Sequence, residues 1–189
     1  HYLAFTEENM KKKDGCLYTM TPPLRSVQDK EAMWKGVMDG AITMISTDHC
    51  AFPEKSKRTC QDWRCVPNGV GGIQQRMVYI FSEGVMKRGL SLQKFVELTS
   101  ANAAKYYGLW PKKGCIAPGS DGDLTLFDPT CRWNFSKENI AGAEDHSLYE
   151  NMEFIGNVQK TILRGKIVFE NGRTNASPGY GRFLARPIC

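Results

Sequence analysis

The fold class is decided by the stretch ITMISTDHCAF at residues 42–52. It begins as a short apolar run, partly β-branched, which is typical of a strand buried on both faces of a parallel sheet. It continues into a polar loop that carries Asp48, His49 and Cys50. In a (β/α) barrel the carboxyl ends of the strands converge on one mouth, where active sites lie. The stretch therefore predicts a buried strand over residues 41–46 that delivers an acid, an imidazole and a thiol to one loop.

Helical patterns dominate the rest of the chain up to about residue 110. The predicted helices cover residues 27–38, about 73–87, 91–98 and 100–108. Ser26 is expected to cap the first of these helices and Gly40 to end it, while Ser100 is expected to cap the last. Helices that alternate with a buried strand indicate an α/β region.

After Pro111 the pattern changes to short strands with Gly-rich turns. The predicted strands cover residues 123–128, closed by Pro129, residues 131–135, and a hairpin over residues 160–172 with its turn near Arg164-Gly165. This part is expected to form a small sheet or sandwich beside the α/β part. We therefore predict two domain segments, residues 1–110 and residues 111–189.

The composition is that of an ordinary globular protein. The 189 residues include 25 Lys and Arg against 20 Asp and Glu, with 41% hydrophobic residues, which excludes collagen-like, coiled-coil and disordered chains. No apolar run approaches the roughly 20 residues of a membrane span, so no membrane association is expected. The basic excess is mild, and its one triplet, residues 11–13, is typical of a solvated turn, so no nucleic-acid partner is expected.

The seven cysteines show no paired CxxC spacing. Cys60 and Cys65 alone are too few for a structural zinc site. The pattern therefore favours reduced thiols and a cytoplasmic protein.

Asp48 is the strongest candidate for chemistry. A carboxylate at the end of a barrel strand can bind a divalent metal and accept a proton from metal-bound water. From the spacing alone Asp48 can equally cap the following turn, so both interpretations stay open. His49 is expected to be a supporting or solvated group rather than a ligand. Cys50 is expected to be buried packing rather than a nucleophile, because no neighbouring feature would stabilise its thiolate.

Two loops flank this motif in the sequence. The first, TMTPPLR at residues 19–25, contains a Pro pair that imposes an extended backbone with free carbonyls, a shape suited to presenting main chain to a ligand. The second, VPNGVGG at residues 66–72, contains glycines that permit close backbone approach, and it lacks the GxxxxGK[ST] pattern of a phosphate loop. Either loop taken alone is also explained as an ordinary turn.

Taken together, these segments and others follow one order along the chain. The order is TPPLR at 21–25, STDHC at 46–50, PNGVGG at 67–72, LTSANAAK at 98–105, PKKGCIAPGSDGD at 111–123 and GRFL at 181–184. The set resembles the C-terminal portion of the hydantoinase/dihydropyrimidinase family of cyclic-amide hydrolases. The Asn-Ala-Ala-Lys and Gly-Ser-Asp-x-Asp elements alone would indicate only the broader amidohydrolase superfamily.

The resemblance implies a fold, a cofactor and an assembly. The fold is the last segments of a TIM-like (β/α)8 barrel, followed by strands of a small composite β-sandwich. The cofactor is a pair of divalent metal ions, commonly zinc, bridged by a carboxylated lysine and a hydroxide. The other ligands are an HxH pair, two further histidines and one aspartate. The implied substrate is a small cyclic amide, and relatives of this kind are commonly homo-tetramers.

The resemblance also assigns roles to three residues. Asp48 matches the aspartate that binds one metal and passes a proton from the bridging hydroxide to the leaving amide nitrogen. Thr21 stands where the family usually has Ser in an SPPLR-like loop, and Asn68 matches the asparagine of the PNG loop. Both are expected to contact the cyclic amide largely through backbone groups. His1 aligns with the His or Gln of a PHYL- or PQYL-like strand and is not expected to bind metal.

The chain is not expected to complete this site from its own residues. It has three histidines, none in an HxH pair, and no residue identifiable as the carboxylated lysine. We therefore expect a fragment of a larger enzyme, cut at His1, that is inactive alone and whose remaining ligands lie upstream.

Other interpretations stay open. Non-catalytic scaffold relatives of the same family have lost the metal ligands, and retention of Asp48 favours an enzyme over a scaffold. Allantoinase-like or dihydroorotase-like enzymes share the metal chemistry, and the loop at residues 67–72 favours a hydantoinase over them. A separate ligand-free β module is disfavoured, because the helices and strand before residue 110 would then leave apolar faces uncovered.

Overall fold

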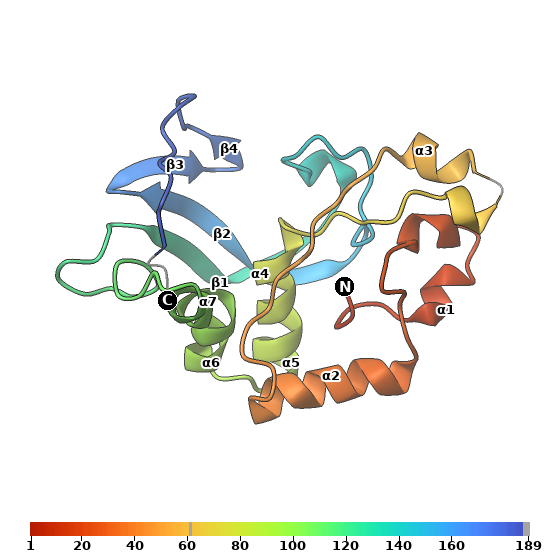
Figure 1. Ribbon diagram of the computed structural model, residues 1–189, viewed down its shortest axis with the longest axis horizontal. Helices are drawn as coiled ribbons and strands as arrows, with labels where there is room; N and C mark the ends of the chain where they lie inside the picture. The colour runs from red at the N-terminus through yellow and green to blue at the C-terminus, as the bar shows by residue number, and fades with distance from the viewer. Residues whose placement is uncertain (61, 187–189) are drawn as a thin grey trace. The chain divides into compact units, whose positions relative to one another are not determined.

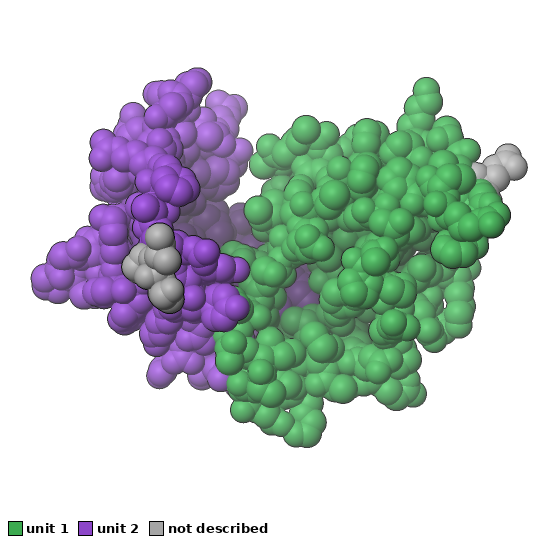
Figure 2. Space-filling view, in the orientation of Figure 1, with its two compact units in different colours: residues 1–76, 134–152 green, residues 77–133, 153–189 purple. Residues whose placement is uncertain are grey.

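The structure, a computed structural model, describes residues 1–60 and 62–186. The chain forms two compact units, drawn in green and purple in Figure 2. The first unit comprises His1–Arg76 and Asn134–Met152, and the second comprises Met77–Trp133 and Glu153–Cys189. These units divide the chain elsewhere than at residue 110, and the division into residues 1–110 and 111–189 stays a prediction about domains.

The first unit is built mainly from short helices and turns (Figure 1). Its elements are α1 Glu7–Met10, the 3₁₀ turn η1 Gly15–Tyr18, α2 Val27–Asp39, α3 Glu54–Arg58, the 3₁₀ turn η2 Trp63–Cys65 and the 3₁₀ turn η5 Lys137–Asn139. The predicted helix over residues 27–38 is confirmed as α2. The Ser26 hydroxyl accepts a hydrogen bond from the Asp29 amide at 3.1 Å, and Gly40 ends the helix with a φ of 85°.

The core of this unit joins the first residues of the chain to α2. Trp34 and Val37 of α2 are 1% and 0% exposed, and the Trp34 indole donates to the Leu3 carbonyl at 2.9 Å. The Phe5 ring meets the ring of buried Tyr149 at 4.9 Å between centroids. Residues that are distant in the sequence therefore form one core, and the loops of this unit are attached to it.

The strand predicted over residues 41–46 is wrong. This segment has neither helix nor strand structure, because a strand needs a ladder of hydrogen bonds to a neighbour and no strand among the described residues pairs with it. The Arg76 guanidinium donates to the Ile45 carbonyl at 3.1 Å instead. Beyond the predicted strand, the Cys50 amide donates to the Val70 carbonyl at 3.0 Å. Separate contacts of this kind, rather than a strand ladder, hold the chain between α2 and α3.

The helical elements of the second unit follow one another in two continuous runs, residues 75–88 and residues 92–106. They comprise α4 Gln75–Tyr79, which begins in the first unit, the π-helical η3 Ile80–Val85, α5 Met86–Arg88, α6 Leu92–Val96, the π-helical η4 Glu97–Ala101 and α7 Asn102–Tyr106. The helix predicted at about residues 73–87 is confirmed. The separate helix expected to begin at Ser100 is wrong, since Ser100 lies inside η4. The helix continues there because Leu98 and Ala101, on either side of Ser100, are both buried in the core.

Within the described residues the second unit also holds one sheet, in the order β1-β2-β3-β4 (Figure 1). Its strands are β1 Leu124–Asn134, β2 Glu153–Leu163, β3 Lys166–Glu170 and β4 Arg173–Thr174. The predicted hairpin is confirmed by the antiparallel pairing of β2 with β3. Its turn residues Arg164 and Gly165 have φ values of 50° and 77°, as a two-residue turn of type I′ requires.

Strand β1 corrects one further expectation. The sequence predicted two strands separated by Pro129, whereas the structure has a single strand through it. Proline is tolerated because β1 lies at the edge of the sheet, where one side of the strand needs no ladder partner. The Asp128 carboxylate also accepts from the Thr130 amide at 2.8 Å and satisfies that donor within the strand.

Candidate functional site

Three loops of the first unit meet at one place. The Gly69 amide donates to the Thr19 carbonyl at 3.1 Å, which joins the loop of residues 66–72 to the loop of residues 19–25. One residue further on, the Val70 carbonyl accepts from the Cys50 amide at 3.0 Å. The loop that follows Asp48 therefore lies against the loop of residues 66–72, although the three loops are separated by many residues in the sequence.

Gly69 is required at this junction. Its φ of 147° lies in a region that side-chain-bearing residues rarely adopt, and a Cβ placed there would come within 2.5 Å of the Cys50 carbonyl oxygen. The glycines of this loop were expected to permit close backbone approach, and Gly69 confirms that expectation.

The two predicted substrate residues are in direct contact. The Thr21 hydroxyl donates to the Asn68 side-chain oxygen at 2.9 Å. Both residues are exposed. Among the described residues, no hydrogen bond engages the main-chain amide or carbonyl of either residue. Donors and acceptors of the two loops are therefore available to a ligand.

Asp48 presents its carboxylate to solvent. Its φ is 48°, and its side chain is exposed and makes no hydrogen bond or ion pair with any described residue. The interpretation of Asp48 as a turn cap is therefore wrong, since the carboxylate accepts no amide of the following turn. Its charge is felt by Tyr2, whose pKa is raised by burial first and by Asp48 second, while Arg25 lowers it.

His49 is locked in place by the protein rather than solvated. Its Nδ1 accepts from the Gly72 and Ile73 amides at 3.1 and 3.2 Å, so the ring proton lies on Nε2. Nε2 in turn lies 3.2 Å from Oε1 of Glu144, to which it donates. This arrangement makes His49 the supporting group that the sequence predicted and ties the end of the loop of residues 66–72 to the Asp48 loop.

Cys50 differs from expectation. It was expected to be buried, but it is exposed, and its Sγ lies 3.0 Å from the position that a Cβ on Gly69 would take. The reason is that residues 48–50 all lie at the surface. All cysteines among the described residues are free, and Cys189 lies outside the described residues.

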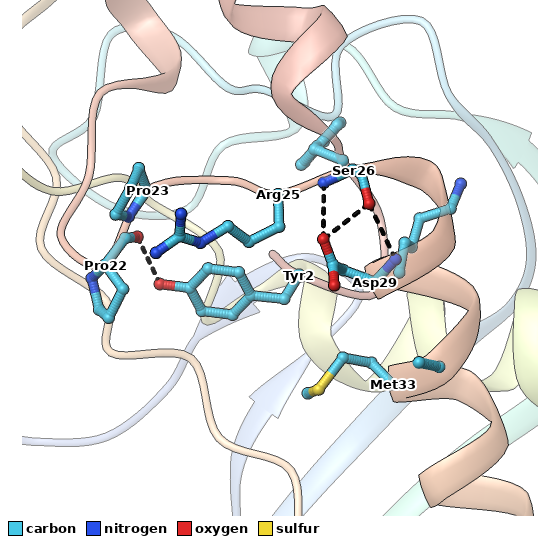
Figure 3. Close-up of a pocket in the computed structure, with 10 residues that line it drawn as sticks. Tyr2, Pro22, Pro23, Arg25, Ser26, Asp29 and Met33 are labelled. Atoms are coloured by element: carbon cyan, nitrogen blue, oxygen red, sulfur yellow. Dashed lines mark hydrogen bonds between the residues drawn. The ribbon is translucent and has the colours of Figure 1, made fainter.

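A pocket of about 430 Å³ opens beside the first loop (Figure 3). It is lined by residues of the first segment, the loop of residues 19–25 and α2: Tyr2, Phe5, Pro22, Pro23, Arg25, Ser26, Asp29, Lys30, Ala32 and Met33. In Figure 3 the Tyr2 hydroxyl points at the Pro22 carbonyl, to which it donates at 2.6 Å. The pocket adjoins Thr21 but is not lined by Thr21, Asp48 or Asn68.

The described residues do not by themselves supply a metal site. No group of three or more His, Cys, Asp or Glu among them is placed to hold a metal ion. Asp48 is exposed and pairs with no other described residue, which suits a ligand, but a single carboxylate cannot hold an ion. No helix of the described part of the chain is long and apolar enough to cross a membrane.

The pattern of the chain matches one protein family along most of its length. The model of the amidohydrolase family matches residues 3–168. The chain belongs to the amidohydrolase family. Among curated amidohydrolases, the D-phenylhydantoinase of Escherichia coli O1:K1 is 39% identical over 187 residues. That match covers 98% of the chain but only 41% of the relative, so the chain spans about two fifths of the length of the relatives it matches.

Solved amidohydrolase structures agree with this assignment. A D-hydantoinase structure superposes with a TM-score of 0.94 at 35% identity and covers 98% of the chain and 41% of its own length. The dihydropyrimidinase of Brevibacillus agri gives a TM-score of 0.92 at 35% identity, covering 98% of the chain and 42% of its own length. The chain corresponds to the C-terminal portion of the hydantoinases, and the expected fold class is confirmed.

Sequence reasoning missed several residues that hold these loops in place. Lys57, Glu144 and Tyr2 each fix one of the loops. Lys57 belongs to the charged run EKSKR of α3, which is typical of a solvent-exposed helix, and Glu144 lies almost a hundred residues from His49. No local pattern in the sequence distinguishes either residue.

Proposed function

We propose that the complete protein is a metal-dependent hydrolase that opens the ring of hydantoins or dihydropyrimidines, and that this chain supplies one metal ligand and two substrate loops to its site. The observation that carries the proposal is the convergence of the loops of Thr21, Asp48 and Asn68. The family membership and the hydantoinase relatives support the reaction class.

In this proposal Thr21 and Asn68 bind and orient the cyclic amide. A cyclic amide or imide presents alternating N–H donors and C=O acceptors along one edge. Thr21 and Asn68 offer main-chain donors and acceptors that make no hydrogen bond within the described residues, and the 2.9 Å contact between their side chains fixes their separation. Because the two loops are already held together, little conformational entropy is lost when the ring binds.

Asp48 is the proton carrier in this proposal. Ring opening adds the oxygen of water to the carbonyl carbon and breaks the bond from that carbon to the ring nitrogen, and the nitrogen leaves readily only if it receives the proton that the water gives up. An exposed carboxylate with no protein partner can take up and release a proton. Such a group, placed on the loop next to the substrate loops, serves as the acid in the step that frees the nitrogen.

The remaining parts of the proposal concern the complete protein. Asp48 would be one of several ligands of a pair of divalent ions, with zinc as the metal and a carboxylated lysine outside this chain as the bridge. A cytoplasmic location accords with the free thiols of the described cysteines, and a homo-tetramer with the family resemblance. Residues 1–110 would belong to the barrel and residues 111–189 to the composite sandwich.

A substrate panel tests the proposal. The complete protein, loaded with zinc, is offered a 5-substituted hydantoin, dihydrouracil, allantoin and dihydroorotate, and ring opening is measured by mass spectrometry of the product. Turnover of the hydantoin or dihydrouracil is expected to exceed that of the other two at least about tenfold, since one tenfold step corresponds to about 1.4 kcal/mol of transition-state binding. Preference for allantoin or dihydroorotate would assign the protein to those enzymes, and failure to open any ring would favour a scaffold.

The panel should include both enantiomers of the hydantoin. An L-hydantoinase from Arthrobacter aurescens superposes on the chain with a TM-score of 0.91 at 28% identity, covering 98% of the chain and 41% of its own length. The D-hydantoinase superposes only slightly better, with a TM-score of 0.94. Because both kinds of enzyme share this portion of the fold, the stereochemical preference has to be measured.

A further inference from the structure

Lys57 is buried in an unusual manner for a lysine. Its side chain belongs to α3 and is 0% exposed. No carboxylate among the described residues forms an ion pair with it, and the hydrogen bond of its Nζ goes to the Thr19 carbonyl at 2.9 Å. Lysines are almost never fully buried unless they are paired, so this position calls for an explanation.

Stability alone does not explain the lysine. Burial lowers the pKa of Lys57, and the nearby thiols of Cys16 and Cys50 partly oppose that shift. A buried ammonium without an ion pair is less favourable than an apolar side chain of the same length. We therefore expect the ammonium to be retained because it fixes the position of the group to which it donates.

That group is the hydrogen-bonding centre of the two substrate loops. The Thr19 carbonyl oxygen accepts from Lys57 at 2.9 Å and from the Gly69 amide at 3.1 Å. Thr19 lies two residues before Thr21, and Gly69 directly follows Asn68. A charge-assisted hydrogen bond is stronger and more directional than a neutral one, so the ammonium fixes the carbonyl to which the second loop is attached.

We infer that Lys57 is a positioning residue for the proposed reaction: it holds the Thr19 carbonyl, and through it Gly69, so that Thr21 and Asn68 face the ring at a fixed separation. The inference rests on the proposed function for its catalytic consequence, but the placement of the loops can be tested separately. Lys57 does not touch the substrate in this inference.

The test compares three variants of the complete protein. Lys57→Met keeps the length and removes the donors, Lys57→Arg keeps the charge and donors, and Lys55→Met is the control, because Lys55 is an exposed lysine of the same helix. Hydrogen exchange of a peptide that covers residues 66–72 is measured by mass spectrometry, with a peptide from α2 as the internal reference.

In Lys57→Met the peptide of residues 66–72 is expected to exchange about tenfold faster, while the α2 peptide changes less than twofold. Such a tenfold change equals about 1.4 kcal/mol of lost protection. The control is expected to match the parent protein. Equal acceleration of both peptides would show a general loss of stability and overturn the inference, and so would an unchanged peptide 66–72. If Lys57→Met does not fold, Lys57→Leu, which also lacks a donor, is used in its place with the same criteria.

Kinetics give the second readout. For the preferred ring, Lys57→Met is expected to raise KM about tenfold and to keep kcat within about threefold of the parent protein, because the loops bind substrate and transition state alike. Lys57→Arg is expected to have a KM close to that of the parent protein. An arginine variant as impaired as the methionine variant would overturn the inference. If the parent protein opens no ring, the proposed function fails, and the exchange measurement still decides whether Lys57 positions the loops.

Discussion

The junction of the three loops leaves no room for a side chain at Gly69. The substitution Gly69→Ala therefore tests how closely the loops approach one another. The glycine has a φ of 147°, and an added Cβ would lie 2.5 Å from the Cys50 carbonyl oxygen, 2.9 Å from the Cys50 Cβ and 3.0 Å from its Sγ. The nearest of these atoms belongs to the backbone, so no side-chain rotation relieves the contact. The loop carrying Asn68 has to move away from the loop carrying Asp48.

The expected cost follows from two contributions. A left-handed φ costs a residue with a side chain about 1–2 kcal/mol, and forcing an extra carbon into a close-packed junction costs about 1–3 kcal/mol more. Gly119→Ala is the matched control, because Gly119 has a φ of 89° but no atom within 4 Å of an added Cβ. We therefore expect Gly69→Ala to lower the free energy of unfolding by about 2–5 kcal/mol and the control by about 1–2 kcal/mol.

Urea denaturation of the two variants and the parent protein, followed by tryptophan fluorescence, measures both values. The amide exchange of Cys50, which donates to Val70 across the junction, provides a local readout. If Gly69→Ala cost no more than Gly119→Ala and left the Cys50 amide protected, the close approach of the two loops would be refuted.

Three further predictions concern the same unit. In a double-mutant cycle, Thr21→Val and Asn68→Ala are expected to show a coupling free energy of about 0.5–1.5 kcal/mol, as one hydrogen bond contributes; additive effects would contradict the contact. Burial raises the pKa of Tyr149, so the folded state holds the neutral phenol, and the free energy of unfolding is expected to fall as pH rises above about 10, the ordinary pKa of tyrosine. Tyr149→Phe is expected to flatten that slope and the exposed control Tyr106→Phe to leave it unchanged; equal slopes in all three proteins would count against the buried phenol. The 189-residue chain alone, with added zinc, is expected to show no ring opening of a hydantoin, because its described residues hold no cluster of metal ligands; robust turnover would contradict this.

Features governed by local chemistry could be predicted from the sequence. The caps of α2 at Ser26 and Gly40 depend on residues three or four positions apart, and the turn at Arg164-Gly165 depends on two residues that accept positive φ. The candidate residues Thr21 and Asn68 came from a family resemblance rather than from periodicity; the structure joins their side chains by a hydrogen bond of 2.9 Å, and their role in binding substrate stays a prediction.

Features that depend on distant partners could not be predicted. The run at residues 41–46 has the composition of a buried strand, but no strand among the described residues pairs with it. Pro129 was expected to end a strand because proline has no N–H for the ladder of hydrogen bonds, yet at the edge of the sheet that N–H is not needed. Lys57 appears in a charged run, and its burial follows from the packing of α3 against the loops.

The central claim is that Asp48 supplies the proton for opening a cyclic amide bound by the neighbouring loops. Asp48→Asn in the complete protein removes the acid while keeping the size of the side chain, and Asp39→Asn is the control, since Asp39 is an exposed carboxylate at the end of α2.

The direct measurement is kcat for the preferred ring in both variants and the parent protein. Asp48→Asn is expected to lower kcat by about 10²–10⁴-fold, the range of general acid–base catalysis, and Asp39→Asn to stay within about twofold of the parent protein. An Asp48→Asn enzyme with the kcat of the parent protein would contradict the account.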